Sequence, residues 1–458
     1  MSVTDSPSCE AIGPQDERYE AARALWNGSI DHRPAAIARP RTDAEVAEAL
    51  LRARDKGAEV AVRGGGHSMQ GHSMSQGGVT IDLSAINRVE VDTQARRARV
   101  GGGALLGDVA RATGPHGLAI PYGHVSHTGV AGLTLGGGIG WITRRHGLTI
   151  DRLRAARVVT AEGEVVRASE DENPDLFWGL RGGGGNFGIV TEFEFELCEH
   201  GPEVLAGMVL HPLERADEAL RFSRDFMEDA PDDLTVYEVF MTVPPAPPFP
   251  EHLQGKPALA IGIVYAGDAD EGERLVRPLR EFGPPALDAL GRMPVPTVQE
   301  MLDPTSPHGL HYYSKSHWLA ELPDPAIERL VELHAGVLSP MSQIITARMG
   351  GATERVAPDS TAFAHRDAHR LLWVIGSWME GDGAEHIEWT RDVFDALTPH
   401  STGGVYVNSL QDESEQRVRD AYSRPTWERL VEVKDRWDPG NVFRLNYNVP
   451  PSARVRAA

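Results

Sequence analysis

The sequence has few cysteines, no long hydrophobic run and no basic leader, and each shortage excludes a class of protein. Its 458 residues include two cysteines, Cys9 and Cys198. Two are too few for a disulfide framework, so a reducing compartment fits best. No uninterrupted apolar run approaches the about 20 residues that a membrane-spanning helix needs. The N-terminal stretch has neither a basic start nor an apolar centre, so it does not resemble a secretory signal, and we expect a cytoplasmic protein.

Basic residues are also in short supply. Lysine and arginine number 45 against 66 aspartates and glutamates, which gives a formal net charge of −21. Such a surface repels nucleic acid and anionic membranes, so we expect neither as a partner. The hydrophobic fraction of 41% and the charged fraction of 24% are ordinary for a globular protein. The length exceeds what one hydrophobic core organises, which predicts at least two domains.

Residues 18–200 mix strand and helix patterns and are rich in glycine. Apolar periodicity predicts a helix over 41–57, with Thr42 or Asp43 as its cap and Gly57 as its end. A hairpin is predicted over 152–169, and period-two alternation predicts a strand in GIVTEFEFEL.

The composition changes after His200, where a second domain is expected. Helix patterns cover 212–230, 268–283 and 324–338, and strand patterns occur in EVFMTV, ALAIGIVYAG and RLLWVIGSW. The alternation predicts an antiparallel sheet faced by helices and an α+β fold class. We therefore expect a flexible start over 1–17, a first domain over 18–200, a second over 201–403, and a terminal segment of mixed structure over 404–458.

Three glycine clusters stand in the first domain: RGGGHS (63–68), GLTLGGGIGW (132–141) and RGGGGNFG (181–188). Glycine lets main-chain N–H groups approach a ligand closely, and successive N–H groups form a concavity for phosphate or for carbonyl oxygens. Three clusters so near each other favour a large, phosphate-bearing cofactor over three ordinary tight turns. No Gly-Lys-Ser/Thr follows, which excludes a nucleotide-kinase loop. The polar, turn-like residues after the first cluster disfavour a Rossmann motif.

Histidines near these clusters raise the alternative of a metal site. His67 and His72 are five residues apart and have no acidic or thiolate neighbour in the sequence. His124 and His127 could supplement them, but polar loop histidines are the more frequent explanation. We predict no metal.

Four motifs, in order along nearly the whole chain, carry a resemblance to a known family. They are VRGGGHSMQGHSM, GHVSHTGVAGLTLGGGIGW, NPDLFWGLRGGGGNFGIVTEFEFEL and the terminal WERLVEVKDRWDPGNVFRLNYNVPP. The chain resembles a bacterial, singly linked member of the berberine-bridge-enzyme-like flavoproteins, which have the vanillyl-alcohol-oxidase (PCMH-type) FAD-binding fold. The resemblance implies an FAD domain built from residues 18–200 and the segment 404–458. An antiparallel-sheet-plus-helices substrate domain is inserted between them.

The resemblance implies a covalent bond between His67 and the 8α-methyl group of FAD. Neutral imidazole is a competent nucleophile, and an attached flavin is a stronger oxidant. Many relatives form a second bond from a cysteine, where this chain has Val125, so a single link is implied. That cysteine belongs to a Gly-x-Cys motif, and neither Cys9 nor Cys198 lies in such a motif.

Further cofactor contacts follow from the resemblance alone. The pyrophosphate cradle would comprise Arg63, Gly64, Gly65, Gly66 and Ser68. The ribityl chain, isoalloxazine and diphosphate would be lined by Gly123, Thr128, Gly129, Gly132, Gly138 and Gly140, with Thr128 near flavin N5. Ile189 and Val190 would meet the adenine end, and Asn446 and Asn448 would close over the isoalloxazine.

The catalytic base is left open among three residues. Oxidation of a C–H bond needs a group that takes a proton as hydride leaves toward N5. The candidates are Glu354, Tyr447, which stands where relatives often have glutamine, and Tyr313. Each has an ordinary alternative, since Glu354 could be a solvated acid and the tyrosines could serve packing. Aromatic residues expected to shape the substrate pocket, unless they are core, are Phe240, Tyr313, Trp318, Trp378 and Tyr406.

The resemblance thus implies an FAD-dependent oxidase that acts on a small organic or natural-product substrate and passes electrons to O2, giving H2O2. Alcohols, sugars, amines and polyketide-like molecules all remain open as substrates. Two alternatives stay open as well: an oxygenase acting through a flavin–oxygen adduct, and a catalytically idle flavin-binding protein. The expected partners are the substrate and O2, and the expected assembly is a monomer or homodimer.

Overall fold

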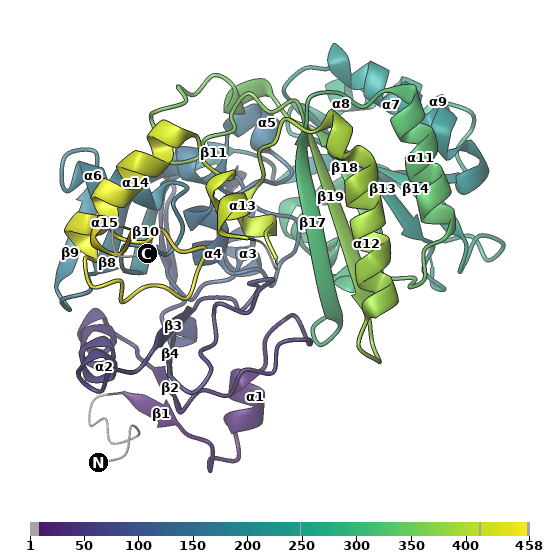
Figure 1. Cartoon of the computed structure of the whole chain (residues 1–458). Coiled ribbons are helices and arrows are strands. Elements are labelled where there is room, and N and C mark those ends of the chain that lie inside the picture. Colours follow the sequence, from purple (N-terminus) through teal and green to yellow (C-terminus); the bar gives the residue numbers. More distant parts are fainter. Residues whose placement is uncertain (1–8, 248, 412–413, 456–458) are drawn as a thin grey trace.

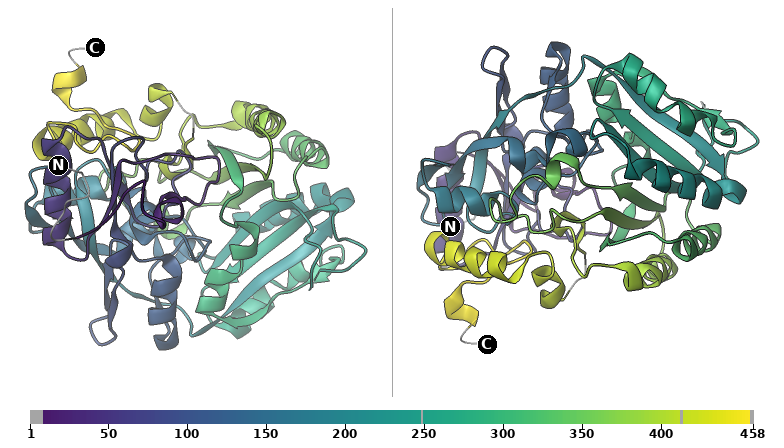
Figure 2. Two further views of the ribbon diagram at one scale, coloured as in Figure 1. Left: turned by 90° about the horizontal axis from the view of Figure 1, so that it is seen from below. Right: turned by 90° about the horizontal axis from the view of Figure 1, so that it is seen from above.

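The structure, a computed structural model, describes residues 9–247, 249–411 and 414–455. Its elements form two halves, with the C-terminal helices returning to the N-terminal half (Figures 1 and 2). No helix in the described residues is long and apolar enough to cross a bilayer.

A small mixed sheet opens the first half, with strand order β1-β2-β4-β3. Its strands are β1 (Glu10–Ile12), β2 (Ala36–Arg39), β3 (Val60–Arg63) and β4 (Val79–Asp82), and α1 (Tyr19–Arg23) and α2 (Asp43–Asp55) accompany them. The Thr42 hydroxyl accepts a hydrogen bond from the Glu45 amide at 3.3 Å, so the predicted cap of α2 is confirmed. Because β1 pairs with β2, residues 10–12 differ from the expected flexible start, and residues 1–8 lie outside the described residues.

The second sheet of this half is antiparallel, in the order β5-β6-β10-β8-β9. Its strands are β5 (Val89–Asp92), β6 (Arg97–Gly101), β8 (Leu153–Val159), β9 (Val165–Ser169) and β10 (Ile189–Glu196), and a separate pair joins β7 (Leu118–Ala119) to β11 (Cys198–Glu199). The helices are α3 (Leu106–Thr113), α4 (Val130–Leu135), α5 (Thr143–His146) and α6 (Pro174–Leu180). The predicted hairpin is present as β8–β9, and Phe193 and Phe195 of β10 are fully buried, as period-two alternation requires.

The second half is a large antiparallel sheet in the order β15-β12-β14-β13-β18-β19-β17, with β16 beside β12. Its strands are β12 (Glu203–Pro212), β13 (Leu234–Thr242), β14 (Pro257–Tyr265), β15 (Leu287–Asp288), β16 (Gly291–Pro294), β17 (His311–Leu319), β18 (Gln343–Arg348) and β19 (Arg370–Trp378). Helices α7 (Ala216–Glu228), α11 (Asp324–Ala335) and α12 (Ala384–Leu397) cover its outer face (Figure 1). Helices α8 (Ala269–Leu275) and α9 (Arg277–Glu281) pack against the same core, and α10 (Val295–Glu300) contacts α3 of the first half.

Alternation in the large sheet separates two environments. In β13, Val236 and Phe240 belong to the apolar core shared with the outer helices. Tyr237, Val239 and Met241 point the opposite way, toward the first half. We call this second side the inner face of the large sheet. The helix expected over 268–283 is interrupted between α8 and α9, beside Pro278, which lacks an N–H group.

The chain finally returns to the first half through α13 (Glu415–Arg419), α14 (Arg424–Trp437) and α15 (Ser452–Val455). Lys434 of α14 is fully buried and fixes this return. Its ammonium donates to the carbonyl oxygens of Asn186 at 2.8 Å and Phe443 at 2.9 Å and pairs with Asp438 at 2.7 Å. The terminal segment therefore packs on the third glycine cluster, as Figures 1 and 2 also show for α14 beside α6.

Candidate flavin and substrate site

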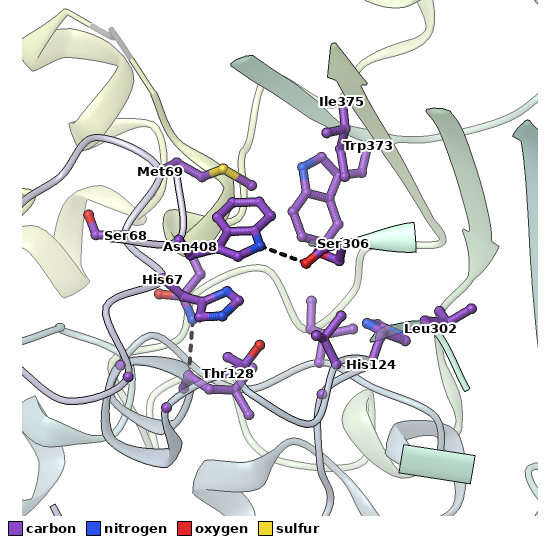
Figure 3. A pocket seen from close by; sticks show the side chains of 18 of the residues that line it. His67, Ser68, Met69, His124, Thr128, Leu302, Ser306, Trp373, Ile375 and Asn408 are labelled. Carbon is purple, nitrogen blue, oxygen red and sulfur yellow. Dashed lines mark hydrogen bonds between the residues drawn. The ribbon is translucent and has the colours of Figure 1, made fainter. Parts of the chain in front are cut away.

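A cavity of about 830 Å³ lies between the glycine-rich loops and the inner face of the large sheet (Figure 3). All three glycine clusters contribute to its wall, and so do Pro244, Ala246, Pro247 and Phe249 and the C-terminal residues Phe443, Leu445, Asn446 and Tyr447. Segments far apart in the sequence thus converge on one site at the junction of the two halves.

Bare backbone forms the wall on the first-half side. A side chain at Gly65 would overlap the backbone of Gly129, so these two loops approach each other as only glycines can. At Gly132 and Gly185 an added Cβ would meet nothing within 4 Å, because both border open cavity. Such a wall suits a large planar ligand that is recognised by main-chain N–H groups.

His67 projects from the first cluster into this cavity (Figure 3). Its Nε2 and the Nδ1 of His127 share a hydrogen bond of 2.7 Å. Its ring stacks on Trp26 at 4.9 Å between centroids, and Trp26 stacks in turn on Tyr312 at 3.8 Å. Burial, reinforced by His127 and His308, holds the pKa of His67 well below its usual range. The imidazole is therefore uncharged near neutrality and is held in one orientation.

The nitrogens of His67, His127 and His308 lie within 4.8 Å of one another. Two imidazole nitrogens on one tetrahedral zinc stand about 3.3 Å apart, given bonds of about 2.0 Å. The 2.7 Å separation of His67 and His127 is instead that of an N–H···N hydrogen bond. The geometry therefore favours a hydrogen-bonded pair, and the absence of a metal stays a prediction.

Several buried polar atoms at or near the cavity form no hydrogen bond with described residues, so they can bond a cofactor. Ser73 Oγ, Asn446 Oδ1 and Asn448 Oδ1 are buried and meet no hydrogen-bond partner among the described residues. Asn186 holds the surrounding loops, since its amide donates to the carbonyls of Gly183 at 2.8 Å and Tyr447 at 3.2 Å. The residues present therefore fit a bound FAD.

Most residues that the sequence assigns to the cofactor line this cavity. They are His67, Gly64, Gly65, Gly66, Ser68, Gly123, Thr128, Gly129, Gly132, Ile189, Val190 and Asn446, with Val125 and Tyr447. The other four are not among the lining residues. Arg63 donates to the carbonyl of Ala22 at 2.6 Å, and the side-chain oxygen of Asn448 is buried. Side chains at Gly138 and Gly140 would overlap Thr149 and Tyr122, so these glycines serve packing.

The three candidate bases are placed differently from one another. Tyr447 lines the cavity, but its hydroxyl donates to the Leu410 carbonyl. Tyr313 faces the outer helices, where its hydroxyl accepts from Arg391 at 3.1 Å, whereas the preceding residue, Tyr312, faces the cavity. Glu354 is not a lining residue, and its carboxylate lies 4.0 Å from His369. The geometry favours neither Tyr313 nor Glu354 as the base.

Of the aromatic residues expected to shape the pocket, Tyr406 lines it. Phe240 packs in the core under the outer helices, and Trp378 stacks on His386. Trp318 is buried in a core cluster with Phe363. The sequence pointed to His124 only in the metal alternative and did not point to Tyr237, Trp373 or Asn408, yet all four line the cavity. The period-two alternation of a strand predicts that Tyr237 and Val239 lie on the same face of β13, but it does not predict whether that face meets a cavity or the core.

Comparisons with known proteins agree with this geometry. A family model described as FAD binding domain matches residues 34–169, and one described as Berberine and berberine like matches residues 405–450. The (R)-6-hydroxynicotine oxidase of Paenarthrobacter nicotinovorans is 31% identical, over 96% of this chain and 96% of its own. The chain belongs to the berberine-bridge-like family of FAD-linked oxidoreductases. It is an FAD-dependent oxidase, whose partners are a small-molecule substrate and O2.

Solved structures of relatives extend the match to three dimensions. The structure of 6-hydroxy-D-nicotine oxidase from Arthrobacter nicotinovorans superposes with a TM-score of 0.88 at 29% identity, covering 98% of this chain and 99% of its own. Glucooligosaccharide oxidase from Acremonium strictum gives 0.84 at 26% identity, over 97% of both chains. Its structure is described as holding a 6-S-cysteinyl, 8α-N1-histidyl FAD. The family fold, with an FAD-binding half and a sheet-containing substrate half, is therefore that of this chain.

Proposed function

We propose that this FAD-linked oxidase holds its cofactor by one covalent bond, from His67. The observation that carries the proposal is His67 itself, an uncharged imidazole held by His127 at the edge of a glycine-walled cavity. The histidyl attachment named for glucooligosaccharide oxidase supports it.

The hydrogen bond to His127 supports attachment through Nδ1 of His67. Nε2 of His67 is occupied at 2.7 Å, which leaves Nδ1 as the nucleophile. With its proton on Nε2, His67 donates to His127 Nδ1, and the lone pair on its own Nδ1 is free. Alkylation of Nδ1 would leave His67 positively charged, and transfer of its Nε2 proton to His127 would make the ring neutral again. Bound FAD supplies a two-electron acceptor that O2 reoxidises.

A second covalent link has no candidate at the site. Val125 is a lining residue at the position where relatives carry a cysteine, and no cysteine is among the lining residues described. Cys198 is buried elsewhere, its thiol donates to the Ala119 carbonyl at 3.2 Å, and burial raises its pKa to about 12. The chain has only two cysteines, too few for a disulfide framework, which supports the further proposal that the protein works in the cytoplasm; we propose a monomer or homodimer.

The oxidase assignment is tested by reduction and reoxidation of the purified holoenzyme. The flavin is reduced anaerobically with limiting dithionite, air is admitted, and H2O2 is measured beside free FAD at equal concentration. We expect one H2O2 per flavin and reoxidation faster than that of free FAD. Reoxidation no faster than free FAD would identify an idle flavin carrier. Once a substrate is known, H2O2 below the amount of product would identify an oxygenase.

A further inference from the structure

The cavity carries no formal charge. Among the described residues that line it there is no aspartate, glutamate, lysine or arginine, although 24% of the chain is charged. Its three histidines are His67, His72 and His124. Burial holds the pKa of His67 well below its usual range and lowers those of His72 and His124 to about 4, so all three are neutral near pH 7. A charged substrate would lose its hydration here without gaining an ion pair, whereas the diphosphate of FAD would be met by the main-chain N–H groups of the glycine loops.

The inner face of the large sheet makes one end of the cavity apolar. Its surface includes Met208, Val239, Met293, Met341, Ile345 and Leu371. These side chains can contact hydrocarbon but cannot bond the many hydroxyl groups of a sugar chain, and methionine adapts its shape to the bound molecule. This end therefore differs from what an oligosaccharide would need, even though glucooligosaccharide oxidase shares the fold.

Polar groups also line this end, among them Gln343, Trp141 and Trp373, and two of them, His124 and Tyr237, are adjacent. The rings of His124 and Tyr237 pack edge to face with their centroids 4.5 Å apart. His124 Nε2 is enclosed and meets no hydrogen-bond partner in the described part of the chain. No described residue bonds the Tyr237 hydroxyl either, whereas the hydroxyls of Tyr312 and Tyr447 donate to the carbonyls of Pro307 and Leu410. Figure 3 shows His124 beside Leu302 at the cavity wall.

We propose that this site oxidises a neutral, largely apolar alcohol whose hydroxyl is bound by His124 and Tyr237. The proposal rests on the proposed function and narrows its substrate. A hydroxyl donates to the unprotonated imidazole nitrogen and accepts from the tyrosine O–H, which satisfies both groups at once. Amines that are protonated near neutrality find no carboxylate among the described residues of the cavity wall, and a sugar chain would bury hydroxyl groups against the methionine and aliphatic side chains of this end.

The reaction balances with the groups named. His124 would take the O–H proton, and bound FAD would supply the two-electron acceptor for the carbinol hydride, so that the alcohol would become a carbonyl compound. The two electrons pass to O2, which with two protons gives H2O2. His124 is thus a catalytic base in direct contact with the substrate.

Matched probes test the substrate class on the holoenzyme. 2-Naphthalenemethanol, 2-naphthoate and cellobiose are titrated anaerobically while the visible flavin spectrum is recorded. We expect the alcohol to perturb or bleach the flavin at a concentration at least tenfold lower than the acid or the disaccharide. Equal or better binding of either other probe, or no response to the alcohol, would overturn the proposal. The dithionite–air cycle on the same sample needs no substrate and measures only whether O2 reoxidises the flavin. It therefore distinguishes a wrong substrate class from a protein that is not an oxidase.

Variants test the assigned residue. The first variant is His124→Leu. Its control is His211→Leu, because His211 is also a buried, neutral histidine but lies in the second half and does not line the cavity. We expect His124→Leu to keep its flavin and slow anaerobic reduction by the alcohol by roughly 10²-fold or more. Tyr237→Phe should raise the alcohol concentration needed for half-maximal reduction. Unchanged reduction in His124→Leu, or an equal loss in His211→Leu, would contradict the role of His124.

Discussion

At the scale of single residues, His67 is defined by what surrounds it. Trp26 fixes the plane of its ring, His127 occupies Nε2, and burial keeps it uncharged. The sequence motif identifies His67 as the attachment residue through resemblance. It does not reveal His127, which lies 60 residues away in another glycine-rich loop.

Substitution of His127 tests that pairing. We expect His127→Ala to slow covalent attachment roughly tenfold, because a hydrogen bond of about 1–1.5 kcal/mol that orients the nucleophile is lost. The measurement is the fraction of flavin that stays with acid-precipitated protein over time after FAD is added to apoprotein. His308→Ala is the matched control, because His308 is near His67 but shares no such bond. Equal rates in wild type and His127→Ala would exclude the pairing from attachment.

At the scale of elements, alternation predicted the strands, whereas their orientation came only from the fold. In β17 the sequence YY offers two adjacent tyrosines, and the prediction chose Tyr313, one register position from Tyr312, which faces the cavity. Glu354 was placed by family analogy, but it follows a short turn after β18 and lies away from the wall. The sequence singled out His124 as a loop histidine, but periodicity does not apply in a loop, so its place in the cavity wall beside Tyr237 emerges only from the folded structure.

The return of α14 to the first half depends on a buried ion pair. Lys434→Met removes the partner of Asp438, whose carboxylate would remain fully buried. We expect the free energy of unfolding to fall by about 3–5 kcal/mol. Arg424→Met on the same helix is the control, since Arg424 pairs with Glu428 at the same spacing but is 89% exposed, and its loss should lower the free energy of unfolding far less. Urea unfolding of both variants measures the two changes in the free energy of unfolding. Similar decreases in Lys434→Met and Arg424→Met would contradict the role given to the buried ion pair of α14.

At the scale of the whole molecule, the sequence indicated two halves with the C-terminal segment completing the first. This organisation could be predicted from three features of the sequence: the glycine clusters, the change in composition after His200 and the family motifs. Contacts between the halves could not be predicted, because the cavity forms only when the inner face of the large sheet meets the glycine loops. The boundaries proposed for the segments remain predictions.

Buried neutral histidines distributed over both halves make stability depend on pH. Burial lowers the pKa of His200 to about 3 and those of His211 and His334 to about 4. The unfolded chain binds protons at these positions below about pH 6.5, whereas the folded chain does not until about pH 4. The free energy of unfolding should therefore fall as pH decreases through this window, by up to about 4 kcal/mol per pH unit for the three together. Urea unfolding at pH 7, 6 and 5 measures it, and a constant value would contradict the prediction.

The attachment of FAD through His67 is tested most directly by acid precipitation of the purified protein, followed by mass analysis of its peptides. We predict a yellow pellet and one FAD on the peptide that contains His67, with no flavin on peptides containing Cys9 or Cys198. His67→Ala should give a colourless pellet with FAD in the supernatant. A colourless pellet from the wild-type protein, or flavin retained covalently in His67→Ala, would contradict the account.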